Sequence, residues 1–284
     1  MTKPVLRFAP SPNGRLHLGH AYSALFTATW AERLDGRFLV RIEDTDPTRS
    51  KPEFTEAIFA DLAWLGLAWE EPVWHQSTRF PVYAAHADRL KAMGLLYPCF
   101  CSRTEVAAGA GATDPDGAPV YGGTCRHLDP GRVAERLAAG DPVQWRLRMD
   151  EAVARTGVLT YSVGQPTPLD RPQLRYARPL RWGDAVIQRK GTPTSYHLSV
   201  VIDDDAQGVT HVTRGRDMEA STDIHVLLQL LLGLAQPLYT FHRLLRDETG
   251  RKLSKSRQSR SLADLRGEGW TANAVRAHLG FAEG

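Results

Sequence analysis

The chain has 284 residues, which is enough for one large domain or for a core domain that carries an insertion. Hydrophobic residues make up 42% of it and charged residues 24%, and no stretch approaches the roughly 18 consecutive apolar residues of a membrane span. The first residues lack the apolar core of a signal peptide, and three cysteines do not indicate a disulfide framework, so we expect a cytoplasmic protein.

The net charge of +3 is too small to indicate nucleic acid, but its distribution is uneven. Residues 126–190 hold 12 basic and 7 acidic residues, and residues 242–260 hold 7 basic and 2 acidic residues, a net of +5 in each. Lysine and arginine release counterions from phosphates, so these stretches could face a polyphosphate or an RNA backbone. A solvated surface explains the counts equally well.

The first 98 residues alternate between strand-like and helical runs. The strand-like runs are residues 5–10 and 37–44, and the helical runs are residues 20–34, 51–67 and 81–95. Alternation of strands and helices with joints rich in Gly and Pro is typical of a parallel sheet wrapped by helices. We therefore predict an α/β fold, with residues 1–98 as the first half of the sheet.

Residues 99–190 break this pattern, and we interpret them as an insertion. They contain a loop rich in Gly, Ala, Pro and Asp, a short helix and two strand-like pieces, at residues 107–119, 130–140, 143–149 and 184–190. Alternation returns in residues 191–284, with predicted strands at 195–204 and 210–215 and predicted helices at 221–234 and 271–281. This last part is the predicted second half of the core.

The first candidate for nucleotide binding lies between Phe8 and His20 and contains the sequence HLGH. It follows a predicted strand and opens a helix, so backbone N–H groups and the helix dipole can face an anion. Gly19 permits close approach to the backbone, and His17 and His20 can donate hydrogen bonds to phosphate oxygens. A strand–turn–helix with two incidental histidines is the alternative.

The second candidate is Lys252–Ser256, which reads KLSKS in a basic segment. Two lysines spaced by three residues can reach one polyphosphate, and mobile ammonium groups suit the charge that develops on leaving pyrophosphate. A solvated basic loop is the alternative.

Together, HLGH early and KLSKS late resemble the signature pair of class I aminoacyl-tRNA synthetases. The resemblance implies a Rossmann-type catalytic domain with an inserted, zinc-bearing subdomain of the acceptor type. It implies ATP binding by His17, Gly19, His20 and Lys255, and catalytic roles for His17, His20, Lys252 and Lys255.

Residues 7–21 and 41–50, RFAPSPNGRLHLGHA and RIEDTDPTRS, resemble the catalytic domain of glutamyl-tRNA synthetases and their relatives. A site for glutamate must match two carboxylates and one ammonium group. Arg7, Ser11 and Glu43 offer a guanidinium, a hydroxyl and a carboxylate. The resemblance implies a glutamate site made of Arg7, Phe8, Ala9, Pro10, Ser11, Glu43, Tyr196 and Arg214.

In this site Arg214 is the expected partner of the side-chain carboxylate, since a permanent cation favours glutamate over neutral glutamine. It ends a predicted strand, where a parallel sheet places ligand groups. Each residue also has a structural alternative. Arg7 or Arg214 could pair with the acids of residues 44–46 or 203–205, Glu43 could cap a helix, and Tyr196 could lie in the core.

All three cysteines fall in one segment, at Cys99, Cys101 and Cys125, and close cysteines in a cytoplasmic protein suggest structural zinc. Spacing alone nominates His127 as the fourth ligand, because histidine is a far commoner zinc ligand than tyrosine. The resemblance instead implies Tyr121, and one Zn²⁺ per chain. Buried free thiols are the alternative.

The chain ends 28 residues after Ser256, whereas glutamyl-tRNA synthetases continue with a large helical anticodon-binding region. Without that region the chain resembles the truncated family of glutamyl-queuosine tRNA(Asp) synthetases. That family activates glutamate without tRNA and attaches it to the queuosine base at the wobble position. The resemblance implies ATP with Mg²⁺, L-glutamate and tRNA(Asp) carrying queuosine as partners, and we expect a monomer.

Three other functions stay open. A cofactor nucleotidylyltransferase can share the HxGH motif, but KLSKS and the arginines of the amino-acid site argue against it. An inactive paralogue would only bind tRNA, and a shortened glutamyl-tRNA synthetase would charge a 3′ end. In the expected reaction the α-carboxylate of glutamate attacks the α-phosphate of ATP, and catalysis is mainly positioning and electrostatics.

Overall fold

A seven-stranded sheet forms the centre of the computed structural model, which describes residues 3–165, 171–245 and 260–281. Its strand order is β3-β2-β1-β9-β10-β6-β7, and every neighbouring pair is parallel except β6 and β7. The strands are Glu70–His75 (β3), Arg37–Ile42 (β2), Val5–Phe8 (β1), His211–Gly215 (β9), Leu238–His242 (β10), Thr160–Val163 (β6) and Gln173–Tyr176 (β7). The predicted parallel α/β core is therefore confirmed.

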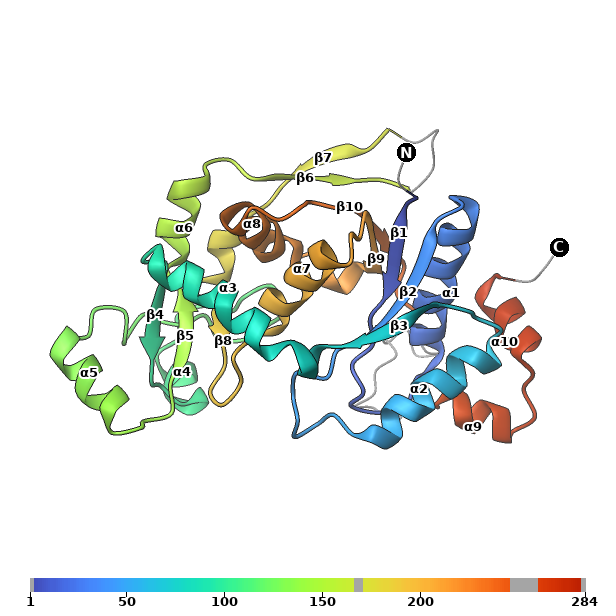
Figure 1. Cartoon of the computed structure of the whole chain (residues 1–284), viewed down its shortest axis with the longest axis horizontal. Helices are drawn as coiled ribbons and strands as arrows, with labels where there is room; N and C mark the ends of the chain where they lie inside the picture. Colours follow the sequence, from blue (N-terminus) through green and yellow to red (C-terminus); the bar gives the residue numbers. More distant parts are fainter. Residues whose placement is uncertain (1–2, 166–170, 246–259, 282–284) are drawn as a thin grey trace.

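Helices cover both faces of this sheet (Figure 1). One apolar cluster joins it to Leu18–Arg33 (α1), Pro52–Trp64 (α2), Leu262–Gly267 (α9) and Ala272–Leu279 (α10). The other cluster joins it to Phe80–Ala92 (α3), Met149–Thr156 (α6), Tyr196–Ala206 (α7) and Thr222–Leu232 (α8). None of the described helices has the length and apolar composition that a bilayer crossing would require.

The alternation of strand residues decides which side chains reach which face. Leu6 and Val40 belong to the cluster on the α1 side, whereas Val5 and Leu39 belong to the cluster on the α7 side. Since successive strand residues point to opposite faces, the odd-numbered positions of β1 and β2 face α7. This parity directs Arg7 and Arg41 toward α7.

A smaller antiparallel sheet, in the order β4-β5-β8, stands beside the central one. Its strands are Leu96–Cys99 (β4), Gln144–Leu147 (β5) and Val186–Gln188 (β8), and Arg103–Ala108 (α4) and Pro130–Ala138 (α5) lie next to it (Figure 1). Strands β6 and β7 also come from residues 99–190 but extend the central sheet. The division of the chain into parts at residues 98 and 190 stays a prediction.

Three short 3-10 turns complete the described elements: Gln76–Arg79 (η1), Pro179–Trp182 (η2) and Arg216–Met218 (η3). One predicted element is of the wrong type: the strand expected at residues 195–204 is helix α7. Its run of Val and Ile resembles a buried strand, but the helix packs against both α3 and α8 as well as the sheet cluster. A helix buried on several sides shows no polar face, so the sequence lacks the pattern that identifies it.

Candidate active site

The order of the strands reverses between β1 and β9. From β1 the chain continues to β2 and β3 on one side, whereas β9 continues to β10 on the other. In open α/β sheets such a switch point opens a crevice at the carboxyl ends of the strands, where ligands bind. A cleft of about 460 Å³ lies there, which is within the range of small-molecule sites.

All eight residues predicted for the amino-acid site line this cleft. They come from the end of β1 and the loop after it, from the residue after β2, from the start of α7 and from β9: Arg7, Phe8, Ala9, Pro10, Ser11, Glu43, Tyr196 and Arg214. The remaining lining residues are Asn13, His20, Ser23, Thr213, Gly215 and Met218. The structure thus brings the predicted set together, while its binding of glutamate stays a prediction.

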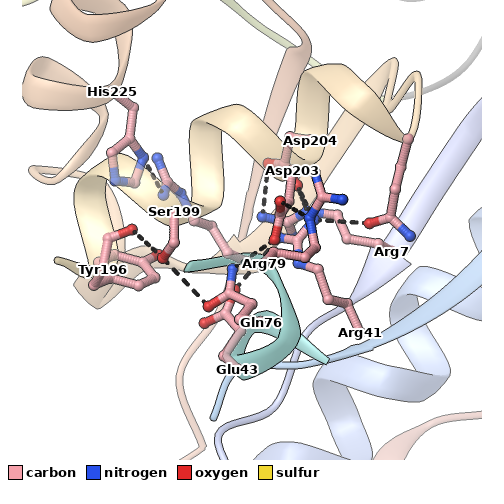
Figure 2. A network of polar contacts seen from close by, with 12 residues as sticks. Arg7, Arg41, Glu43, Gln76, Arg79, Tyr196, Ser199, Asp203, Asp204 and His225 are labelled. Carbon is pink, nitrogen blue, oxygen red and sulfur yellow. Dashed lines mark hydrogen bonds and ion pairs between the residues drawn. The ribbon is translucent and has the colours of Figure 1, made fainter. Parts of the chain in front are cut away.

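A buried ion-pair network joins two residues that line the cleft, Arg7 and Glu43, through Arg41 and Asp204 (Figure 2). The carboxylate of Asp204 accepts hydrogen bonds from Arg7 at 3.0 and 3.2 Å and from Arg41 Nη1 at 2.8 Å. Arg41 Nη2 also donates to Glu43 Oε1 at 3.4 Å, and its side chain is fully buried. Arg7 therefore forms the ion pair with one of the acids at 203–205 that was the structural alternative for it, and it also lines the cleft.

The two carboxyl groups of this network have opposite pKa shifts. Burial raises the pKa of Asp204, but the neighbouring Arg7 and Arg41 outweigh it and hold this pKa below its ordinary value. For Glu43 burial is the dominant cause, and its pKa is raised although Arg41 and Arg7 act in the other direction. Asp204 is therefore a fixed negative charge, and Glu43 is the carboxyl group of the network that takes up a proton more readily.

Arg214 is held by neutral groups. Its Nη1 lies 3.1 Å from His225 Nδ1, its Nη2 donates to Thr222 Oγ1, and its guanidinium lies over the rings of Tyr239 and Phe241 at 5.1 and 5.7 Å. Among the described residues, no carboxylate forms an ion pair with it. The positive charge of Arg214 is thus left for an anion in the cleft.

His225 is neutral, because burial, followed by the nearby Arg214, lowers its pKa well below the ordinary value. Since its Nδ1 accepts from Arg214, its Nε2 carries the hydrogen and donates to His197 Nδ1, 3.2 Å away. The same two causes lower the pKa of His197 to about 4. A row of neutral imidazoles therefore orients Arg214 without cancelling its charge.

Sequence reasoning missed His225 and considered Asp204 only as a possible structural partner. His225 is a lone histidine in an apolar helical run, and nothing in that run distinguishes it from a core residue. Its contact with Arg214 joins residues 11 apart and depends on how the chain turns between β9 and α8, which the sequence pattern does not show.

A second group of contacts holds α7 in place behind the cleft. The carboxylate of Asp203 accepts from Gln76 Nε2 at 3.1 Å, Arg79 Nε at 2.7 Å and the Tyr83 hydroxyl at 2.6 Å (Figure 2). Gln76 in turn accepts from the Ser199 hydroxyl at 3.2 Å. These bonds connect α7 to η1 and α3, so neighbouring Asp204 reaches β1 and β2 from a rigid support.

The predicted phosphate motif forms the start of α1. His17 is the N-cap: its Nδ1 accepts from the N–H of Gly19 at 3.0 Å, and His20 Nδ1 accepts from the N–H of His17 at 3.1 Å. His20 lines the cleft, whereas His17 is only 8% exposed and is not among the residues that line it. A Cβ atom on residue 19 would lie 2.8 Å from His17 Cε1, so the group that approaches Gly19 closely is the His17 ring.

Lys252 and Lys255 lie outside the described residues, but the chain on both sides of them contacts the start of α1. Before them, His242 Nε2 lies 3.2 Å from Ser23 Oγ. After them, Ser261 forms a β-bridge with His17, and the next residue donates its N–H to the carbonyl of Leu16 at 2.8 Å. The segment with the predicted lysines therefore begins and ends beside the predicted phosphate motif.

The three cysteines lie together, with the sulfur atoms of Cys99, Cys101 and Cys125 within 4.8 Å of one another. The hydroxyl oxygen of Tyr121 lies 3.5 Å from Cys101 Sγ and accepts from the N–H of Cys125 at 2.7 Å. His127 is exposed and does not belong to this group of donor atoms.

The surroundings of Cys99 favour its thiolate. Burial raises the pKa of this thiol, but hydrogen bonds from Tyr121, Gln144 and Arg146 outweigh burial and bring it to about 7. For Cys101, burial and the neighbouring cysteines raise the pKa to about 11, so Cys99 is the thiol of this pair that loses its proton more readily. Three sulfur donors suit a soft or borderline cation.

Comparisons with known proteins agree with this site. Residues 3–281 match the family of class I tRNA synthetases (E and Q), catalytic domain. The chain is 44% identical to the glutamyl-Q tRNA(Asp) synthetase of Rhodobacter capsulatus, over 98% of this chain and 100% of that protein, and 38% identical to that of Symbiobacterium thermophilum, over 98% and 86%.

Among solved structures, the glutamate-tRNA synthetase of Elizabethkingia anophelis superposes with a TM-score of 0.76 at 25% identity, over 98% of this chain and 61% of that one. Both the sequence relatives and the fold therefore point to one family. The chain belongs to the class I tRNA synthetases for glutamate and glutamine, and within them to the glutamyl-Q tRNA(Asp) synthetases.

Proposed function

We propose that this chain forms glutamyl-AMP from ATP and L-glutamate without tRNA, and transfers the glutamate to the queuosine base of tRNA(Asp). The acceptor follows from relatives that match nearly the whole chain and are named for glutamyl-Q tRNA(Asp) synthesis. The observation that carries the choice of glutamate is the charge balance of the cleft.

Within the cleft and its ion-pair network, the charges of Arg7 and Arg41 are matched by those of Asp204 and Glu43. Arg214 adds one positive charge that no described carboxylate neutralises. Glutamate carries one net negative charge at neutral pH and would neutralise this excess positive charge. Glutamine has no net charge and would leave it unbalanced. Leaving a desolvated cation unpaired costs several kcal/mol, so about 10²-fold or stronger discrimination is expected.

In the proposed complex, Arg214 binds the side-chain carboxylate and Glu43 binds the α-ammonium group. An oxygen of the substrate's α-carboxylate attacks the α-phosphorus of ATP, and the bond to pyrophosphate breaks. The Nδ1 atoms of His17 and His20 accept from backbone N–H groups at the start of α1, so their Nε2–H groups would donate to phosphate oxygens, and the dipole of α1 would favour the anion. Mg²⁺ accompanies ATP as its phosphate counterion.

Lys252 and Lys255 complete this proposal as the groups that stabilise the charge on departing pyrophosphate. Contacts of Ser23 with His242 and of His17 with Ser261 support it, because they hold both ends of the lysine segment beside the phosphate motif. Positioned cations of this kind act mainly on the transition state of phosphoryl transfer.

We also propose one structural Zn²⁺ bound by Cys99, Cys101, Tyr121 and Cys125. The three sulfur atoms and the Tyr121 oxygen already face one another at ligand-like spacing, which the exposed His127 does not. Zinc would hold the loop that follows β4 to the segment around Cys125.

The acceptor is tested by incubating the protein with ATP, radiolabelled glutamate and purified tRNA(Asp) with or without queuosine, and with tRNA(Glu). We expect label only on tRNA(Asp) that carries queuosine, in the anticodon-loop fragment after ribonuclease digestion. A glutamate-dependent ATP–pyrophosphate exchange assay without tRNA tests the first step separately. Label at the 3′ end of tRNA(Glu) would show a shortened glutamyl-tRNA synthetase instead.

A further inference from the structure

A second pocket, of about 190 Å³, lies beside the amino-acid cleft and contains three arginines, Arg171, Arg175 and Arg216. It is formed by the β6–β7 hairpin, which runs along the top of the view in Figure 1, and by the carboxyl ends of β9 and β10. The other residues that line it are Val163, Gly164, Gln165, Gln173, Thr240 and Phe241. We call it the arginine pocket.

The arginine pocket carries an excess of positive charge. None of its lining residues is acidic, and within the described chain its one ion pair joins Arg175 to Glu219. Neither Arg171 nor Arg216 forms an ion pair with any residue that the structure describes. Arg171 and Arg216 are exposed and line the same pocket as Arg175, so their like charges repel unless an anion binds there, and planar guanidinium donors match phosphate oxygens.

The arginine pocket adjoins the amino-acid cleft. Gly215 links Arg214, which lines the cleft, to Arg216, which lines the pocket. The Phe241 ring lines the pocket and lies 5.7 Å from the Arg214 guanidinium, so it separates the two sites. An anion held in the pocket is therefore a neighbour of the activated amino acid.

The position of the pocket distinguishes the RNA from ATP as the source of this anion. The residues proposed for the ATP phosphates, at the start of α1, do not line it. Its volume suits one phosphate group rather than a whole nucleotide. An acceptor base must leave its loop to reach the adenylate, and such a loop needs backbone contacts that position it.

We infer that the arginine pocket binds a backbone phosphate of the tRNA anticodon loop and positions the acceptor base beside the glutamyl-adenylate. The inference rests on the proposed function, because it takes tRNA as the second substrate. The pocket takes no part in adenylate formation, so its loss affects the second step alone.

The test is the double variant Arg171→Gln/Arg216→Gln, which removes two charges and keeps polar side chains. We expect the rate of ATP–pyrophosphate exchange to stay within about twofold of the unaltered protein. The KM for tRNA(Asp) in glutamate transfer should rise about tenfold or more. In filter binding of labelled tRNA(Asp), the slope of log Kd against log[KCl] should fall by about one for each phosphate that the variant no longer binds.

Arg132→Gln is the matched control, because Arg132 is an exposed arginine on α5, distant from the hairpin in Figure 1, and it pairs with Glu135 at 3.4 Å. Arg132→Gln should leave unchanged both the KM for tRNA(Asp) and the slope of log Kd against log[KCl]. Unaltered tRNA binding and salt dependence in the double variant would refute the pocket's role, as would a raised KM for ATP or weaker inhibition by pyrophosphate.

Failure of the proposed function gives a different result. If the unaltered protein binds tRNA(Asp) but transfers no glutamate to queuosine, the acceptor is wrong. The salt dependence of tRNA binding in the double variant still decides whether the pocket holds an RNA phosphate.

Discussion

Arg7 and Arg41 are buried in neighbouring strands and share the carboxylate of Asp204. Neither cation could stay in this position without a partner, because an unpaired buried charge costs several kcal/mol. The network therefore supports the fold and also presents Arg7 to the amino-acid cleft. Its residues cannot be divided into structural and functional ones.

Asp204→Ala is expected to lower the free energy of unfolding by about 3–5 kcal/mol, because it leaves two buried arginines without their carboxylate. Urea denaturation at pH 7 measures this loss. Since the pKa of Asp204 is lowered in the folded chain, its contribution is complete above its unfolded pKa of about 4 and is lost as pH falls through the lower folded pKa. Asp88→Ala, which removes an exposed pair with Lys91, is the control and should have little effect. An equal loss of unfolding free energy in Asp204→Ala and Asp88→Ala would contradict the stabilising role of Asp204.

Glu43 makes the affinity for glutamate depend on pH. Its pKa is raised above 4.5 mainly by burial, and the protonated form cannot attract an ammonium group. The KM for glutamate in pyrophosphate exchange should therefore rise as pH falls through this raised pKa, by about tenfold per pH unit once pH is below it. In Glu43→Gln the KM should be high and independent of pH over the same range. A flat profile in the unaltered protein would exclude this role.

Helix α1 shows how one element combines a cap with a binding site. His17 and His20 satisfy backbone N–H groups that the first turn leaves without partners, and the same turn reaches the cleft through His20. Gly19 is required because the His17 ring lies against it. The motif therefore caps the helix by itself, independently of any phosphate that it binds.

Gly19→Ala should displace the His17 ring, since the added Cβ would lie 2.8 Å from its Cε1. We expect pyrophosphate exchange to fall about 10- to 100-fold, as for other small misplacements of catalytic groups. Stability should change by only about 1 kcal/mol, because the cost of a weakened cap is offset by replacing glycine in a helix. Gly267→Ala, at a glycine with no atom within 4 Å of the added Cβ, should leave exchange unchanged. Normal exchange in Gly19→Ala would argue against His17 as a phosphate ligand.

At the scale of elements, local pattern identifies some helices and strands but not others. The helical runs at residues 20–34, 51–67 and 221–234 correspond to α1, α2 and α8, because each run is long enough for a helix and a glycine follows the end of that helix, at Gly36, Gly66 and Gly233. Helix α7 has the pattern of a strand because it is buried on several sides. Strands β6 and β7 escape prediction, because four-residue strands have little pattern of their own. β6 pairs with β10, where Val163 is opposite Tyr239, 76 residues further along the chain, and β7 pairs with β6.

Across the whole molecule, two large apolar clusters hold the central sheet, while the cysteine region has a small cluster of its own. That cluster consists of Tyr97, Cys99, Phe100, Tyr121 and Cys125. A core of this size contributes little burial energy, and small units of this kind are commonly held by a metal. Zinc is therefore expected to matter for the stability of this end of the molecule.

Protein prepared without chelator should contain one zinc per chain by elemental analysis. Its removal should lower the melting temperature by about 6–10 °C, which corresponds to roughly 3 kcal/mol for zinc at a hundredfold excess over its Kd. Tyr121→Phe should bind zinc more weakly, whereas His127→Ala should bind it normally. The reverse pattern would make His127 the ligand, and zinc content near zero would exclude the site.

The sequence by itself determined the parallel α/β class, the phosphate motif at the start of a helix and the residue set of the amino-acid cleft. The first two properties are carried by local periodicity and by one short motif. The residue set of the cleft, with Tyr196 and Arg214 far from Arg7 along the chain, is what the resemblance to glutamyl-tRNA synthetases implies. The tertiary structure decided which charges are neutralised. Asp204 meets Arg7 and Arg41 only because α7, more than 160 residues along the chain, brings it to β1 and β2. Neutral His225 meets Arg214 across the turn that joins β9 to α8, 11 residues apart. The uncompensated charge of Arg214, on which the choice of glutamate depends, results from those contacts.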